Sequence, residues 1–402
     1  MASIVIASAV RTPIGAFQGC LQSIGAPALG GFAIKEAIKQ AKLDPSIIDQ
    51  TIMGCVLQAG LGQAPARQAG VFGGVPLSVP ALTVNKVCGS ALRAVTIGYN
   101  EIMAKQAKIC VVGGMENMSQ APYLSLTSRS GMRLGHGALK DHMFLDGLED
   151  AYEKSTLMGV YAEACASYYK IDRAIQDEQA THSLMRAKAA SEQGKFSHEM
   201  VKLTLKEKGK KGEEEKEIIL DELPQIADLE RIKSLKPAFA NDGTVTAANA
   251  SAISDGAAAL ILCDENIAKA HNLPILARVE GHANYAGEPN WFTTAPIHAT
   301  RKLLNQLDWH KDKIDLWEVN EAFAVVSHLY TQELGLNHEK VNIHGGACAL
   351  GHPIGASGAR ILVTLIHALR QQGGGRGLAS ICIGGGEAIA LAIMVDDKAT
   401  TS

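Results

Sequence analysis

Two cysteines occupy sequence settings that suit chemistry on a thiol. Cys88 lies in LTVNKVCGSALRAV, residues 82–95, between an extended apolar run and a segment with helical character. The free N–H groups and macrodipole at a helix N-terminus stabilise a thiolate, so this setting is typical of a nucleophile. Cys382 lies in CIGGGEAIA, at the predicted end of a strand and before three glycines. For Cys88 the alternative is a buried structural thiol, the commoner fate of a lone cysteine. For the segment of Cys382 the alternative is that the glycine triplet forms an ordinary turn.

A histidine and a carboxamide supply polar groups that a reactive thiol needs. His352 lies in HGGACALGHPIGASGAR, residues 344–360, where glycines indicate a loop and Pro353 the first turn of the next helix. Asn320 and Glu321 follow an apolar run in WEVNEAFA, residues 317–324. The alternatives are a structural histidine for the first and a helix cap for Asn320.

A metal site is the competing interpretation of the glycine-rich segment. His344, Cys348 and His352 recur at intervals of four, which would bring three zinc ligands to one helix face. The glycines and Pro353 disfavour a continuous helix, and the sequence suggests no fourth ligand, so no metal is expected. A Walker A motif, a dinucleotide fingerprint and HExxH do not occur, and Ser357 lacks the G-x-S-x-G spacing.

The elements that must position these residues alternate between short apolar runs and segments of helical period, which predicts an α/β protein. In the first half we expect strands at 3–9, 51–57, 81–87 and 108–113 and helices at 28–41, 63–72 and 89–106. In the second half we expect strands at 275–282, 315–319, 341–343, 378–383 and 388–395 and helices at 297–308, 321–334 and 354–372. Because the order repeats, we infer a duplicated βαβαβαββ unit.

An insertion interrupts the first copy. Residues 121–249 are mixed and polar, and the run KEKGKKGEEEKE at 206–217 carries ten charges in twelve residues, which predicts a solvated loop. A strand at 257–263 then resumes the first copy. The expected domains are therefore an N-terminal half, 1–120 with 250–272, an inserted domain, 121–249, and a C-terminal half, 273–402.

Composition limits the partners. The chain of 402 residues is long enough for two cores, and 38 Lys and Arg against 41 Asp and Glu favour neither nucleic acid nor an anionic membrane. The eight scattered cysteines are interpreted as reduced thiols. The N-terminus lacks signal-peptide features, and no apolar run is long enough to span a membrane, so a cytoplasmic location is expected.

Five motifs together resemble the thiolase family. They are NKVCGSALRA, LKPAFANDGTVTAANAS, EVNEAFA, GGACALGHPIGASGAR and CIGGG. Within the family the chain is most similar to the acetyl-CoA acetyltransferases. The resemblance implies two similar halves in a five-layered α/β/α/β/α fold, an inserted loop domain over the active site, and a homotetramer.

The activity that the resemblance implies is the reversible ping-pong condensation of two acetyl-CoA into acetoacetyl-CoA and coenzyme A, through an acetyl-enzyme. Acyl-CoA and coenzyme A would be substrates, with no permanently bound cofactor. A broader-chain 3-ketoacyl-CoA thiolase of fatty acid β-oxidation is the alternative. A coenzyme A-binding protein without activity is a third hypothesis, motivated by Glu387, which stands where many relatives have methionine in GGGMG.

The resemblance also implies roles for individual residues. Cys88 would be the nucleophile, with His352 as its base. Cys382 would remove a proton from the methyl group of the second acetyl-CoA. Asn320 would hold a water that, with His352, binds the thioester oxygen, while the backbone N–H groups of Cys88 and Gly384 would form a second oxyanion hole.

Contacts to coenzyme A complete the predicted site. Leu148 and Met158 would lie near the acyl group, and Phe239, Ala247, Ala250 and Ser251 would contact the pantetheine and adenine. Arg231 would supply positive charge for the phosphates. Leu157 and Phe292 depart from residues found in many relatives, and we expect them to reshape the acyl pocket.

Overall fold

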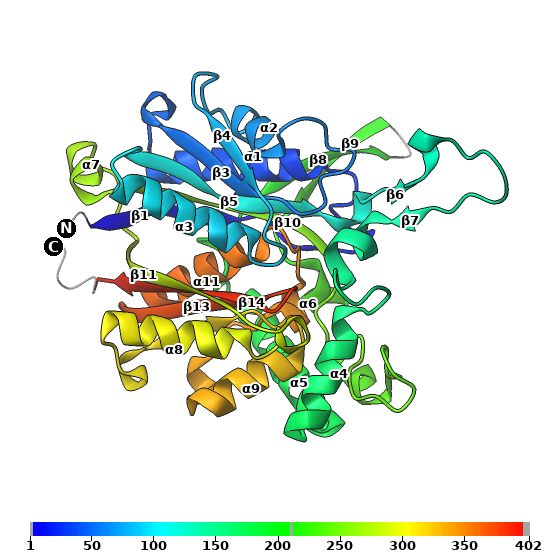
Figure 1. The fold of residues 1–402 in the computed structure, drawn as a ribbon. Coiled ribbons are helices and arrows are strands. Elements are labelled where there is room, and N and C mark those ends of the chain that lie inside the picture. Colours follow the sequence, from blue (N-terminus) through cyan, green and yellow to red (C-terminus); the bar gives the residue numbers. More distant parts are fainter. Residues whose placement is uncertain (1–2, 210–211, 397–402) are drawn as a thin grey trace.

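A continuous mixed sheet organises the protein. The structure is a computed structural model that describes residues 3–209 and 212–396; the remaining residues of the three predicted domains lie outside the described part. The strand order of the main sheet is β12-β13-β14-β11-β1-β10-β5-β3-β4, and a short pairing of β1 with β11 joins its two halves. Figure 1 shows these halves as two stacked layers of strands.

The first half follows the predicted order of elements. Its strands are β1 (Ile4–Arg11), β2 (Gly15–Ala16), β3 (Gln50–Gly54), β4 (Ala81–Val84), β5 (Ile109–Asn117) and β10 (Ser254–Asp264). Its helices are α1 (Ala26–Ala41), α2 (Pro65–Phe72), α3 (Ser90–Met103) and α7 (Glu265–Ala270). Proline stands in the first turn of α1 and of α2, where its missing N–H is not needed.

The second half repeats most of this order. Its strands are β11 (Ala277–Ala286), β12 (Leu316–Val319), β13 (Gly375–Ile383) and β14 (Glu387–Val395). Its helices are α8 (Ala295–Leu307), α9 (Ala324–Leu334), α10 (Ala347–Leu350) and α11 (Ser357–Gln371). The inserted segment holds α4 (Met158–Tyr169), α5 (Arg173–Glu192), α6 (Glu222–Ile226), β6 (Tyr123–Leu124), β7 (Lys140–Asp141), β8 (Leu203–Gly209) and β9 (Gly212–Ile218).

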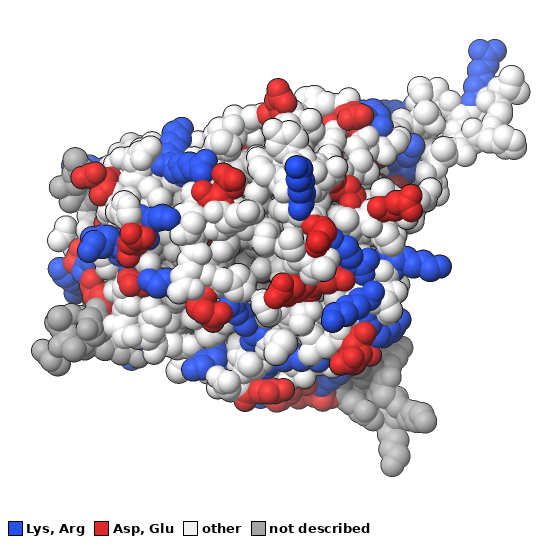
Figure 2. Space-filling view, turned by 90° about the horizontal axis from the view of Figure 1, so that it is seen from below, with Lys and Arg blue, Asp and Glu red and all other residues white. Residues whose placement is uncertain are grey.

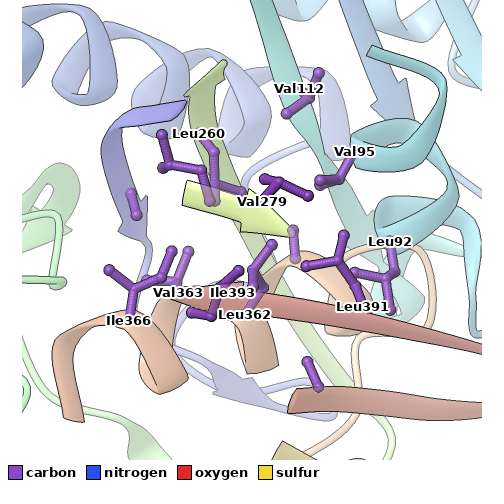
Figure 3. Packing of buried hydrophobic residues seen from close by; sticks show 14 of the residues in the cluster. Leu92, Val95, Val112, Leu260, Val279, Leu362, Val363, Ile366, Leu391 and Ile393 are labelled. Carbon is purple, nitrogen blue, oxygen red and sulfur yellow. The ribbon is translucent and has the colours of Figure 1, made fainter. Parts of the chain in front are cut away.

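Three packed cores alternate with the two sheet layers. One lies under α1 and α2, one between the sheets around α3 and α11, and one under α8 and α9. Figure 3 shows the middle core, where Leu92 and Val95 of α3 face Leu362 and Ile366 of α11 across strand residues. Because α11 lies between two sheets, its residues 357–369 are buried on every side. Helices and strands therefore form the five layers, α/β/α/β/α, that were expected.

The predicted strand at 341–343 is wrong. Among the described residues this segment makes only a single bridge, from Val341 to Trp317. Asn342 has a left-handed backbone (φ 47°), and its side-chain amide bonds both the N–H and the C=O of Val319 at 2.9 Å. A side chain therefore replaces the strand pairing that the apolar pattern suggested.

The predicted loop at 206–217 is also wrong, because residues 206–209 and 212–217 belong to the antiparallel strands β8 and β9, while residues 210–211 lie outside the described part. The register pairs Leu203 with Ile218, and both side chains are buried in the core under α1. Leu203 and Ile218 lie at the base of the hairpin, where it packs against the rest of the protein. Both residues are outside the charged run at 206–217. The charges of residues 206–217 hid the strand pattern.

A buried ion network fastens the inserted segment to the first half. Arg11, at the end of β1, donates to Glu199 at 2.5 Å and to both carboxylate oxygens of Asp221 at 2.7 and 2.9 Å. All three side chains are almost completely buried. On the molecular face shown in Figure 2, by contrast, acidic and basic side chains are interspersed in solvent.

We expect Arg11→Met to lower the free energy of unfolding by about 3–5 kcal/mol, because it leaves two buried carboxylates without their partner. Urea-induced unfolding measures the change. The control is Lys39→Met, which removes the exposed Lys39–Glu36 pair and should cost at most about 1 kcal/mol. Equal costs for the two variants would contradict a role for the network in fastening the insertion.

Candidate active site

A largely apolar cavity of about 530 Å³ brings most of the predicted site residues together. Cys88, His352 and Gly384 contribute to its wall. The predicted coenzyme A contacts that also line it are Leu148, Met158, Phe239, Ala247, Ala250 and Ser251. Residues from both halves and from the insertion therefore share one cavity.

Arg231 lies elsewhere. Its exposed side chain lines a neighbouring pocket, which shares Ala247 and Ala252 with the main cavity. Arg231 therefore lies beside the cavity and not in its wall.

Cys88 lies two residues before the start of α3, on a tightly held loop. Val87 has φ 46°, a conformation that costs free energy for a β-branched residue. Two short bonds hold it, because Ser90 Oγ donates to the Val87 carbonyl at 2.6 Å and accepts from the Lys86 N–H at 2.8 Å. Helix α3 begins at Ser90, one residue after the predicted start at residue 89.

The resting state of Cys88 is a neutral thiol. Burial raises the pKa of Cys88 to about 11, and the backbone N–H of Gly384 opposes this rise. Burial thus outweighs the stabilisation of a thiolate that the helix N-terminus is expected to supply. To act as a nucleophile, this thiol would have to give its proton to a base.

His352 has the protonation state that a base requires. Burial lowers the pKa of His352 to about 3, so its imidazole is neutral at physiological pH. Nδ1 lies 2.5 Å from Ser357 Oγ, and that hydroxyl donates its own hydrogen to the Pro353 carbonyl. Nδ1 must therefore carry the ring hydrogen, which leaves a lone pair on Nε2.

Asn320 and Cys382 lie behind the cavity wall at the ends of β12 and β13. The Asn320 Nδ2 atom is 3.5 Å from Nε2 of His352, and its Oδ1 has no hydrogen-bond partner among the described residues. Burial is the main cause, and the nearby Cys88 a second cause, of a pKa for Cys382 well above its ordinary value.

A buried carboxylate that the motifs did not reveal holds the His352 loop in place. Glu116, in β5, accepts from the N–H groups of Val56, Leu57 and Gly355 at 2.9–3.1 Å. Burial raises the pKa of Glu116 to about 7, although these bonds oppose the rise. The signal in the sequence is a single acid after a fully apolar strand, in CVVGGME.

The three candidate zinc ligands do not converge. His344 contacts Gln371, Cys348 lies near carbonyl oxygens, and His352 contacts Ser357. Within residues 3–209 and 212–396, no group of three His, Cys, Asp or Glu side chains is arranged to hold a metal ion.

Two departures from the family motifs, Leu157 and Phe292, lie in the cavity wall. The ring of Phe292 packs edge to face against Phe323 at 6.3 Å, and Phe323 packs likewise against Phe239 at 6.1 Å. Glu387 neither breaks β14 nor points freely into solvent, because β14 begins there and its carboxylate pairs with Lys86.

Comparison with known proteins identifies this arrangement. The family model described as the thiolase N-terminal domain matches residues 4–266, and the model described as the thiolase C-terminal domain matches residues 273–395. The chain belongs to the thiolase family. The family and the fold predicted from the motifs are confirmed.

Similar proteins cover nearly the whole thiolase chain. The acetyl-CoA acetyltransferases of Escherichia coli and Cupriavidus necator are 48% and 46% identical to it, each over 98% of this chain and 99% of its own length. The crystal structure of the Acat5 thiolase from Ascaris suum in complex with coenzyme A is 41% identical, with a TM-score of 0.92 over 98% of this chain and all of that one. In the described part of this thiolase, no helix is long and apolar enough to cross a membrane.

Proposed function

We propose that this thiolase is an acetyl-CoA C-acetyltransferase, which condenses two acetyl-CoA reversibly into acetoacetyl-CoA and coenzyme A. The observation that carries the proposal is the meeting of Cys88, a neutral His352 and the Gly384 N–H in one apolar cavity. The names of relatives at 46–48% identity support the choice of substrate.

The first half-reaction transfers an acetyl group to Cys88. Nε2 of His352 takes the thiol proton, and the Cys88 sulfur forms a bond to the thioester carbon. The N–H groups of Cys88 and Gly384 bind the oxygen as it becomes negative. The bond from that carbon to the coenzyme A sulfur then breaks, and the leaving thiolate takes a proton from Cys382.

The second half-reaction forms the carbon–carbon bond. The Cys382 thiolate removes a methyl proton from a second acetyl-CoA, while the protonated His352 and a water on Asn320 donate to the enolate oxygen. The enolate carbon attacks acetyl-Cys88, the carbon–sulfur bond breaks, and His352 returns its proton to Cys88. Protons balance over the cycle, and acetoacetyl-CoA is released.

Short acyl chains are the expected substrates. The cavity of about 530 Å³ must hold the pantetheine arm as well as the acyl group, and packed aromatic rings line it. We expect thiolysis of the C4 3-ketoacyl-CoA to be faster than that of C8 and C16 substrates, measured as kcat/KM. Faster cleavage of the longer chains would favour a broader β-oxidation thiolase.

The remaining features of the assignment are proposals of the same kind. We assign coenzyme A to the cavity residues Leu148, Met158, Phe239, Ala247, Ala250 and Ser251, with Arg231 beside its phosphates.

Exposed apolar side chains on the insertion support a homotetramer; they are Tyr123, Leu126, Met132, Leu134 and Leu139. Eight unpaired cysteines support a reducing, cytoplasmic location. The domain boundaries at 121, 249 and 273 remain as predicted from the sequence.

A further inference from the structure

An ion pair joins the two loops that meet at Cys88. The ammonium group of Lys86, two residues before the thiol, contacts the carboxylate of Glu387. Glu387 is the first residue of β14 and directly follows the turn Gly384–Gly386. The contact therefore links the loop of the nucleophile to the turn that carries the Gly384 N–H.

An apolar contact accompanies this ion pair on the other side of Cys88. Ile383 stands opposite Glu387 in the register of β13 and β14. A Cβ atom added to Gly89 would lie only 2.4 Å from Cδ1 of Ile383, so this side chain packs directly against the Gly89 backbone. The cross-strand pair of Ile383 and Glu387 thus contacts both sides of the segment Val87–Cys88. Glu387 contacts Lys86 before it, and Ile383 contacts Gly89 after it.

The loop needs such support because its own conformation is strained. Val87 has a left-handed backbone, and a β-branched residue holds that conformation only where its surroundings impose it. Ser90 and Asn85 bond the loop from within. From the facing half, Ile383 and the Lys86–Glu387 pair supply the contacts described above.

We propose that Lys86 and Glu387 are positioning residues, an electrostatic clamp that fixes the Cys88 sulfur against the Gly384 N–H. The inference rests on the proposed function, in which this N–H binds the thioester oxygen. Both side chains are partly exposed, at 22% and 34%, so dissolved salt weakens their attraction.

The test measures the rate at which acetyl-Cys88 forms at saturating acetyl-CoA. Glu387→Gln keeps the side-chain shape and removes the charge, and we expect this rate to fall about two- to fivefold, as befits a partly exposed pair. The half-saturating acetyl-CoA concentration should stay constant, because neither residue lines the cavity. The exchange of charges in the double variant Lys86→Glu, Glu387→Lys should restore most of the rate.

Salt dependence and a matched control separate the clamp from general structural damage. As ionic strength rises from about 0.01 to 1 M, the screening length falls from about 30 to 3 Å, and the wild-type rate should approach that of Glu387→Gln. Glu333→Gln removes a more exposed pair, with Arg301, on the outer helices and should keep wild-type rate and salt dependence.

Several results would overturn the clamp. One is an unchanged rate of acetyl-Cys88 formation in Glu387→Gln. Another is a change only in the half-saturating acetyl-CoA concentration. The third is a double variant, Lys86→Glu with Glu387→Lys, that forms acetyl-Cys88 no faster than Glu387→Gln. If the wild type forms no acetyl-Cys88, the proposed function fails instead, and hydrogen exchange then tests the clamp. The backbone amide hydrogens of Val87 and Gly89 should exchange faster in Glu387→Gln than in the wild type. Equal exchange rates in the two proteins would exclude the clamp.

Discussion

Replacement of Cys88 by alanine should abolish both acetylation by acetyl-CoA and the synthesis of acetoacetyl-CoA. Without the sulfur no covalent intermediate forms, and loss of a nucleophile costs about 10⁴-fold or more in kcat. A discontinuous assay with radioactive acetyl-CoA measures transfer to protein, and thiolysis of acetoacetyl-CoA measures the reverse direction. Both should fall to background.

The control for this variant is Cys20→Ala. Cys20 is also a partly buried, unpaired thiol, but it lies outside the cavity and its N–H bonds Glu222. Its replacement should leave both rates within about twofold of wild type, as expected for a change away from the reacting atoms. A Cys88→Ala protein that condenses acetyl-CoA at a rate near that of this control would disprove the assignment of the nucleophile.

Cys382→Ala should separate the two half-reactions. Acetyl transfer to Cys88 should persist, because His352 still accepts its proton and solvent can protonate the leaving thiolate. Removal of the methyl proton should be slower by about 10²–10⁴-fold, the usual contribution of a general base. The measurement is loss of the methyl proton signal of acetyl-CoA in deuterated water, followed by nuclear magnetic resonance.

A second buried cysteine controls for the cavity that this substitution creates. Cys165 is fully buried in the same core as Cys382, under α8 and α9, and does not line the active-site cavity. Cys165→Ala should therefore reproduce any loss of stability while methyl exchange stays near the wild-type rate. If both variants lose exchange equally, the effect belongs to packing, and Cys382 is not the base.

The residues to which we assign chemistry could be selected from the sequence because each belongs to a motif with a structural meaning. A thiol before a helix, glycines around a histidine and a carboxamide after a strand all fix positions along the chain. The sequence could not give the protonation state of Cys88, since the burial that raises its pKa comes from both halves of the fold. Glu116 was missed for the same reason, as its three N–H partners lie up to 239 residues away.

The two wrong elements have local physical causes. At Asn342 a side-chain amide makes the bonds of a strand, so the apolar residues beside it predicted a pairing that the backbone does not form. At β8 and β9 the charged residues obscured the few buried apolar residues that pack the hairpin against the core. Periodicity identifies an element well when the alternation covers its whole length, and poorly when only its ends are buried.

The location of the acetyl group on the wild-type protein tests the account most directly. The protein is incubated with acetyl-CoA, quenched in acid and digested, and the modified residue is identified by mass spectrometry. We predict one acetyl group, on Cys88, which is lost when coenzyme A is added before the quench. An acetyl group on Cys382 in place of Cys88, or none on either thiol during turnover, would contradict the acetyl-Cys88 mechanism.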